Sequence, residues 1–204
     1  MITKTEVFKD IEKHLLYDET PSSYLNYISE TAPFEEYPFK WLKDMKSTMQ
    51  SPKYHPEGSV WNHTMLVVDE AAKERHKSKN MRVFMWAALL HDIGKPGTTK
   101  VRKGRITSYD HDKLGAKLAK EFLKEFSQDS EFIEEVSNLV RWHMQILFTL
   151  NGLPYGDIEE MKKHTDVEEL ALLGFCDRMG RTGANRDEEI KNIDLFLDKV
   201  YSRV

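Results

Sequence analysis

The chain has 204 residues, of which 40% are hydrophobic and 31% charged, so it can fold as one domain with a sizeable core. Its formal net charge of -4 excludes a global basic field, and broad non-specific binding of nucleic acid is therefore not expected, although a local basic patch stays open. The single cysteine, Cys176, excludes an intramolecular disulfide and fits a reducing cytoplasm, and no apolar stretch is long enough to span a bilayer.

The N-terminal third reads as short helices followed by a loop. The chain is polar from Met1 onward, which is not the pattern of a signal peptide. Apolar residues at helical spacing predict two short helices in the first forty residues and a third near Trp41. Residues 51–59 are a loop by composition, and Ser59 is expected to cap a helix from Val60 to about His76.

The segment from Met81 to Ile93 is the most apolar part of the chain and is predicted to be the buried helix. Gly94, with Pro96 just beyond it, is the expected C-terminal stop of that helix. Residues 95–110 are predicted to form a basic loop, in which residues 105–107 could be extended.

The second half of the chain is predicted to be helical. Helices are expected from Asp110 or His111 to Phe126, from Ser130 to about Leu150, from a cap at Asp166 through Asp177, and from residue 187 to residue 204. No strand ladder, internal repeat or low-complexity tract is recognisable. The fold class is therefore predicted to be all-α.

The run His-Asp-Ile-Gly-Lys at residues 91–95 is the most informative feature of the sequence. Neighbouring side chains on a helix point about 100° apart, but at a helix end the last turn can open and let both converge. A carboxylate can bridge two metal ions, so Asp92 is the natural shared ligand of a two-metal site. The candidate ligands of this site are His63, His91, Asp92, His111, His143 and Asp177.

Each of these residues also has an ordinary structural interpretation. His63 could be a buried core histidine, His143 a cation at a helix C-terminus, and His111 a residue at the start of a helix. Asp177 could form a local salt bridge with Arg178. The six residues together favour a metal site, and their nitrogen and carboxylate donors suit borderline to hard divalent ions.

With these residues in place, the sequence resembles the HD superfamily of metal-dependent phosphohydrolases. More closely, it is similar to the HD domain attached to bacterial tRNA nucleotidyltransferases, the CCA-adding enzymes. Asp110 stands where this subgroup usually has glycine. The likeness covers roughly residues 40–182 and is carried by the segments at residues 54–64, 87–96, 104–111, 139–144 and 177–181.

The resemblance implies a helical bundle with the metal site between its helices. We expect one HD domain over residues 1–204, with an N-terminal extension and loop at 1–58, a metal-binding core at 59–182 and a C-terminal helix at 183–204. No nucleotidyltransferase domain is recognisable, so the sequence is interpreted as a stand-alone, cytoplasmic HD protein without membrane partners.

The implied activity is hydrolysis of a phosphomonoester or phosphodiester by a metal-activated water. The substrate would be a small phosphorylated molecule such as a nucleotide, a cyclic nucleotide or an RNA end. One divalent ion (Mn, Fe, Ni, Co, Mg or Zn) would bind His63, His91, Asp92 and Asp177, and a second would bind Asp92, His111 and His143.

Lys95 is expected to contact a substrate phosphate beside Asp92, and further substrate contacts are expected from His55, Arg105, Arg178 and Arg181. Two alternatives stay open at this stage. One is a di-iron HD-type oxygenase, and the other is a non-catalytic module that binds metal or nucleotide.

Overall fold

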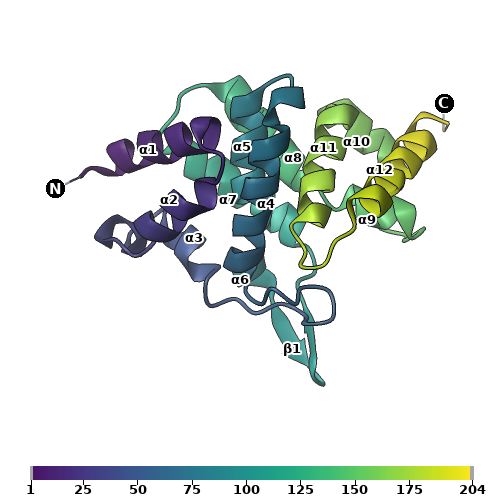
Figure 1. Cartoon of the computed structure of the whole chain (residues 1–204), viewed down its shortest axis with the longest axis horizontal. Helices are drawn as coiled ribbons and strands as arrows, with labels where there is room; N and C mark the ends of the chain where they lie inside the picture. Colours follow the sequence, from purple (N-terminus) through teal and green to yellow (C-terminus); the bar gives the residue numbers. More distant parts are fainter. Residues whose placement is uncertain (1, 203–204) are drawn as a thin grey trace.

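The computed structural model of the chain describes residues 2–202. Helices and one small hairpin are the regular elements of these residues, so the all-α prediction is confirmed. Figure 1 shows a central group of helices, with N-terminal helices on one side and C-terminal helices on the other. Among the residues described, no helix has the length and apolar character needed to cross a membrane.

The central group is arranged around helix α5. Residues 83–90 of α5 are all buried, as its continuous apolar sequence predicts. Helix α5 packs against α4, α8 and α11, while α7 packs along α8. The bounds are α4 (Val60–Glu74), α5 (Met81–Leu90), α7 (His111–Lys124), α8 (Ser130–Trp142) and α11 (Val167–Met179), with a 3-10 turn η2 (Arg75–Lys77) after α4.

The N-terminal helices continue the core of the central group. Phe8 stacks on Trp86 of α5, with ring centroids 4.5 Å apart, and on Phe126, at 4.7 Å. Burial of such aromatic pairs contributes strongly to a core. The elements on this side are α1 (Lys4–Tyr17), α2 (Pro21–Ile28), η1 (Ala32–Glu35) and α3 (Lys40–Asp44).

On the other side, helix α12 covers the central group. It packs against α11 and α9, and α10 packs against α9. The bounds are α9 (Gln145–Leu150), α10 (Ile158–His164) and α12 (Arg186–Tyr201). Two expected caps are present: Ser59 Oγ accepts from Asn62 N at 3.2 Å, and the Asp166 carboxylate accepts from the first backbone N–H groups of α11.

The single helix predicted from Ser130 to Leu150 is instead two helices, α8 and α9. They are separated by a turn at His143 and Met144, where the Nδ1 atom of His143 lies 2.7 Å from Val140 O. The turn lets α9 leave α8 and contact α12. Sequence periodicity could not distinguish the two arrangements because both keep the same helical repeat.

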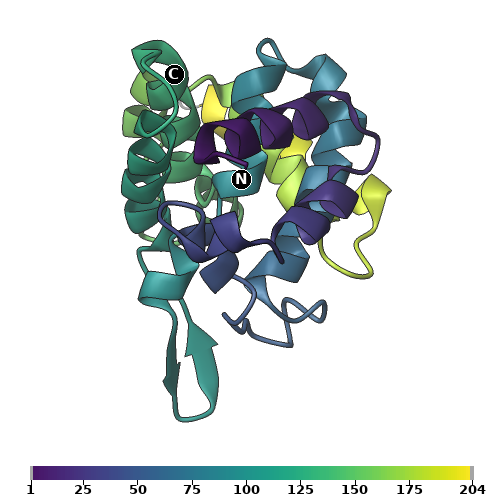
Figure 2. The same cartoon turned by 90° about the vertical axis from the view of Figure 1, so that its left-hand side faces the viewer.

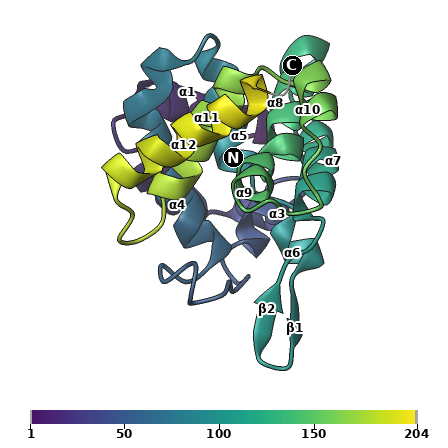
Figure 3. The same cartoon turned by 90° about the vertical axis from the view of Figure 1, so that its right-hand side faces the viewer.

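The prediction that the chain has no strand ladder is wrong for residues 100–107. After the short helix α6 (Lys95–Thr98), strands β1 (Lys100–Arg102) and β2 (Arg105–Thr107) pair antiparallel. Lys103 and Gly104 have φ values of 49° and 75°, the positive values that a tight two-residue hairpin turn requires. Figures 2 and 3 show this hairpin projecting beyond the helices.

Gly94 does not stop helix α5 in the way the sequence suggested. The helix ends at Leu90, and Gly94 has ordinary right-handed angles, φ -80° and ψ -15°. Its physical role is close approach: a Cβ atom at this position would lie 2.1 Å from His111 O and 2.5 Å from Gly115 N. The absent side chain therefore allows the turn after α5 to lie directly against the first turn of α7.

We expect the substitution Gly94→Ala to destabilise the protein, at the upper end of the range of about 1–3 kcal/mol that overpacking costs, because backbone atoms must move apart. The free energy of unfolding, measured by chemical denaturation, checks this. Gly97→Ala is a matched control, since its Cβ atom would meet only the flexible end of Leu114, at 2.8 Å. Equal stability of the two variants would contradict this interpretation of Gly94.

Candidate metal centre

The six predicted ligands converge on one cluster at the centre of the fold. They come from the first turns of α4 and α7, the C-terminal turns of α5 and α8, and the end of α11. Five of them are buried, and the side chain of Asp177 is 14% exposed. Two groups have ligand atoms close enough to share an ion: His63 with His91 and Asp92, and Asp92 with His111 and His143.

Three of the histidines are oriented in the same way. The Nδ1 atom of each lies within hydrogen-bond distance of the backbone carbonyl three residues earlier: His91 of Ala88 (2.9 Å), His111 of Ser108 (2.6 Å) and His143 of Val140 (2.7 Å). A neutral imidazole that donates from Nδ1 carries a lone pair on Nε2. This arrangement therefore directs a metal-binding atom of each ring away from its own helix.

The Nε2 atoms of His111 and His143 lie only 3.2 Å apart, and they are 3.4 Å and 3.8 Å from Asp92 Oδ1. Burial lowers the pKa of His143 to about 3 and also lowers that of His111, so both rings are neutral near pH 7. Two Nε2 lone pairs at this separation repel each other. A divalent cation between them and the carboxylate would remove the repulsion.

The other half of the cluster also contains buried polar atoms without partners. His91 Nε2 lies 3.2 Å from Asp92 Oδ2, and His63 Nε2 lies 2.9 Å from Asp177 Oδ1. Neither His91 Nε2 nor Asp92 Oδ1 has a hydrogen-bond partner among the residues described, although both are buried. Unpaired buried polar atoms are costly, and a metal ion would satisfy them. The residues therefore fit divalent metal ions with nitrogen and oxygen ligands.

Asp92 is held by a lysine from the same turn. Lys95 Nζ donates to Asp92 Oδ2 at 2.6 Å and to Gln50 Oε1 at 2.6 Å. Burial alone would raise the pKa of Asp92, but the positive charge of Lys95 keeps it well below its usual value. The sequence predicted that Lys95 contacts a substrate phosphate. In the structure Lys95 is buried with its ammonium group turned toward Asp92, and the phosphate contact stays a prediction.

Sequence reasoning missed Glu57, which orients the fourth histidine. Glu57 Oε1 lies 2.9 Å from both His63 Nδ1 and His55 Nδ1, and its side chain is only 3% exposed. Burial opposes ionisation of Glu57, but hydrogen bonds, above all from His63, lower its pKa to about 2. Glu57 lies in a loop, where no periodicity marks a functional side chain. The only signal was its place in the segment at residues 54–64.

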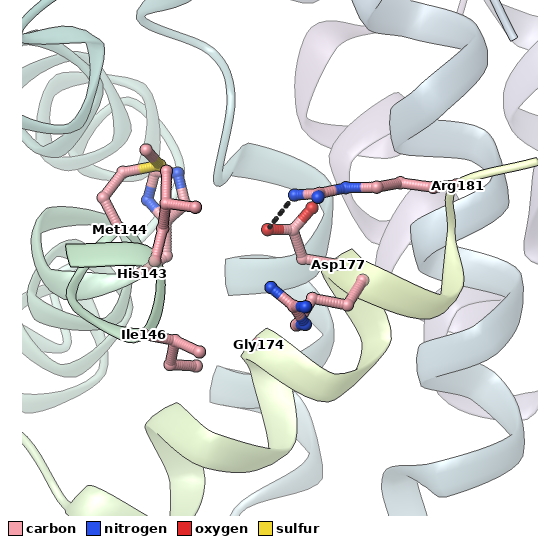
Figure 4. A pocket seen from close by; sticks show the side chains of 8 residues that line it. His143, Met144, Ile146, Gly174, Asp177 and Arg181 are labelled. Atoms are coloured by element: carbon pink, nitrogen blue, oxygen red, sulfur yellow. Dashed lines mark ion pairs between the residues drawn. The ribbon is translucent and has the colours of Figure 1, made fainter. Parts of the chain in front are cut away.

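The remaining predicted residues surround the cluster or lie outside it. Arg178 and Arg181 line a cavity of about 20 Å³ that also reaches His143 and Asp177. Figure 4 shows Asp177 and Arg181 on one side of this cavity and His143 on the other. Arg181 Nη2 lies 3.8 Å from Asp177 Oδ2, whereas Arg178 pairs with Glu189.

His55 and Arg105 have different positions relative to the cluster. The His55 ring lies 4.8 Å from that of His63, and burial, with a contribution from Lys95, lowers the pKa of His55 to about 4. Arg105 lies exposed on the projecting hairpin, outside the cluster. Trp61, a neighbour of this region in sequence, is a buried core residue whose Nε1 donates to Asn26 Oδ1 at 2.8 Å.

Comparison with known proteins matches the centre of the chain to a described family. The model of the HD domain matches residues 60–188, which include all six candidate ligands. The chain is 24% identical to the "Multifunctional CCA protein" of Mannheimia succiniciproducens and 25% identical to that of Pasteurella multocida, over 89% of this chain and 44% of each relative. The protein of the same name from Haemophilus influenzae is 25% identical over 91% of this chain and 46% of its own length. The chain thus spans less than half the length of these relatives.

We expect Glu57→Ala to weaken metal binding about 10- to 100-fold, because partners that orient a ligand histidine have effects of this size. Titration of the metal-free protein with Mn²⁺ or Zn²⁺ against a competing chelator measures the affinity. Glu160→Gln is a matched control, since Glu160 Oε1 lies 2.9 Å from His164 Nε2 at the exposed surface. Unchanged affinity in Glu57→Ala would contradict the assigned role.

Proposed function

This chain belongs to the HD-domain family, and on that premise we propose that it is a phosphohydrolase acting through two divalent metal ions held by its buried histidines and aspartates. HD domains form a superfamily of metal-dependent phosphohydrolases. The observation that carries the proposal is the pair of adjoining ligand groups, which share Asp92. A shared carboxylate between two ions is the common arrangement of two-metal hydrolytic sites.

We propose that one ion binds His63, His91, Asp92 and Asp177, and that the second binds Asp92, His111 and His143. When bound, the ions would activate a water molecule as nucleophile and neutralise charge on the phosphoryl oxygens. Any of Mn, Fe, Ni, Co, Mg or Zn is compatible with this donor set.

The protein's own residues prepare the site for this chemistry. Lys95 keeps Asp92 ionised and fixes one of its oxygens, so the carboxylate is preorganised before substrate arrives. Arg181 lies at the cavity beside Asp177, where its guanidinium can donate to a phosphoryl oxygen. Arg178 lines the same cavity, and its ion pair with Glu189 leaves it the weaker candidate for this contact.

The proposed substrate is a phosphomonoester or phosphodiester of a nucleotide, a cyclic nucleotide or an RNA end. The name of the relatives, "Multifunctional CCA protein", supports a nucleotide or RNA substrate.

We also propose residues 59–182 as the metal-binding core, residues 1–58 as an N-terminal extension and residues 183–204 as a C-terminal helix. A cytoplasmic location is proposed because the one cysteine, Cys176, is a buried free thiol.

We expect Asp92→Ala to lower phosphoester hydrolysis by about 10³-fold or more, because metal ions contribute several kcal/mol to such reactions. Turnover is measured on nucleotides, 2′,3′-cyclic phosphates and model phosphoesters, with Mn, Ni, Co, Mg and Fe supplied separately. The control is Asp110→Asn, which changes an exposed aspartate whose left-handed backbone, φ 59°, asparagine also tolerates.

Elemental analysis separates the proposal from its alternatives. We expect about two metal ions per chain in the parent protein and about one in His143→Ala, which removes a ligand of only one proposed ion. Iron with oxygen-dependent turnover and no phosphatase activity would establish an oxygenase instead. Bound metal without turnover on any phosphoester would establish a binding module.

A further inference from the structure

The projecting hairpin carries a charge that its own fold does not explain. All three residues of β1 are exposed, and β2 begins exposed at Arg105. A two-stranded hairpin without a hydrophobic face against a core is marginally stable by itself. The side chains of this hairpin therefore contribute little to the stability of the helical core. Folding does not explain why so many of them are basic.

The cations of the hairpin have no acidic counterparts. No acidic residue occurs between Lys95 and Asp110, and the hairpin contains Lys100, Arg102, Lys103 and Arg105. Among residues 2–202, none of these four has an ion pair, whereas the lysines that flank the hairpin, Lys95 and Lys113, each pair with an aspartate. The formal charge of the whole chain is -4, so this positive charge is local and uncompensated.

The strand register concentrates the charge on one face. Arg102 lies directly opposite Arg105, and Lys100 lies opposite Thr107, so these four residues share a face while Val101 and Ile106 occupy the other. Like charges directly opposite each other destabilise a strand pair. A bound polyanion would reverse this penalty.

The base of the hairpin adjoins the metal centre. Thr99 Oγ1 and Ser108 Oγ lie 2.7 Å apart and close the base, and Ser108 O accepts the hydrogen bond from His111 Nδ1. At the start of the same segment, Lys95 contacts Asp92. Tyr109, between the hairpin and His111, is 75% exposed and offers a free aromatic ring.

We propose that the basic face of the hairpin binds the phosphate backbone of a single-stranded nucleic acid whose terminal phosphate lies at the metal centre. This proposal rests on the proposed function and specifies its substrate. Strand geometry places the two arginines on the order of 10 Å beyond Ser108, so they suit the phosphates of a chain that continues past its terminal nucleotide. The exposed ring of Tyr109 suits stacking of a base, which single strands allow.

The rest of the protein is negatively charged overall, so a nucleic-acid strand is expected to approach the metal centre from the side of the hairpin. A polyanion is attracted only where cations are exposed and unpaired, and the hairpin supplies such cations next to the site.

The test is binding of fluorescent 12-nucleotide RNA and DNA single strands, followed by anisotropy at several salt concentrations without added metal. We expect Arg102→Gln/Arg105→Gln to bind both strands about tenfold more weakly. The slope of log affinity against log salt should become shallower by about 1.4, because each phosphate that an arginine neutralises on a single strand contributes about 0.7. RNA and DNA should lose affinity alike, since the hairpin binds phosphates and not bases.

The matched control is Lys117→Gln/Lys124→Gln, which removes the same charge from exposed positions on α7. This control should bind both strands like the parent. Equal binding by the two double variants would overturn the proposal, as would competition by poly-glutamate as effective as that by an unlabelled strand. Thermal denaturation of each variant checks that the fold is retained.

Turnover distinguishes this proposal from the proposed function. One outcome is that the parent protein hydrolyses phosphoesters while the arginine variant binds strands as well as the parent does. That result would overturn the hairpin site and would be consistent with the proposed phosphohydrolase. Hairpin-dependent strand binding in a parent that hydrolyses no phosphoester would support the backbone site and overturn the hydrolase.

Discussion

The rest of the structure depends on one buried carboxylate, that of Asp92. Burying an ionised carboxylate costs several kcal/mol unless cations and hydrogen bonds compensate it. Lys95 contacts one of its oxygens, and the Nε2 atoms of His91, His111 and His143 surround it within 3.8 Å. These groups lie at the ends of α5 and α8 and at the starts of α6 and α7, so satisfying Asp92 requires these helices to meet at one point.

That requirement explains the close packing around the turn after α5. Gly94 permits the turn to touch the backbone of α7 at His111, and Gly174 on α11 permits the equally close approach of Ile146 on α9. The break between α8 and α9 frees His143 to turn inward. The glycine at position 94 and the break at His143 each bring a metal-binding histidine close to Asp92, and Gly174 lets α9 pack against α11, the helix that carries Asp177.

Charge is organised in two different ways in this molecule. In the centre, the buried charges have close partners that fix their positions, as Glu57 does for His63 and Lys95 does for Asp92. On the hairpin, the cations face solvent, have no acidic partners among residues 2–202 and are accessible to an anionic ligand. The net charge of -4 averages over both regions and therefore does not reveal the local basic face.

The sequence by itself determined the helical class, the buried character of α5 and the six candidate ligands, because apolar period and residue chemistry are local properties. Only the tertiary structure decided where Lys95 points, that Glu57 orients His63, and that Gly94 serves close approach instead of a helix stop. It also decided the break at His143 and the pairing of residues 100–107. These features depend on distances between segments far apart in the chain, and residue spacing along the sequence does not contain those distances.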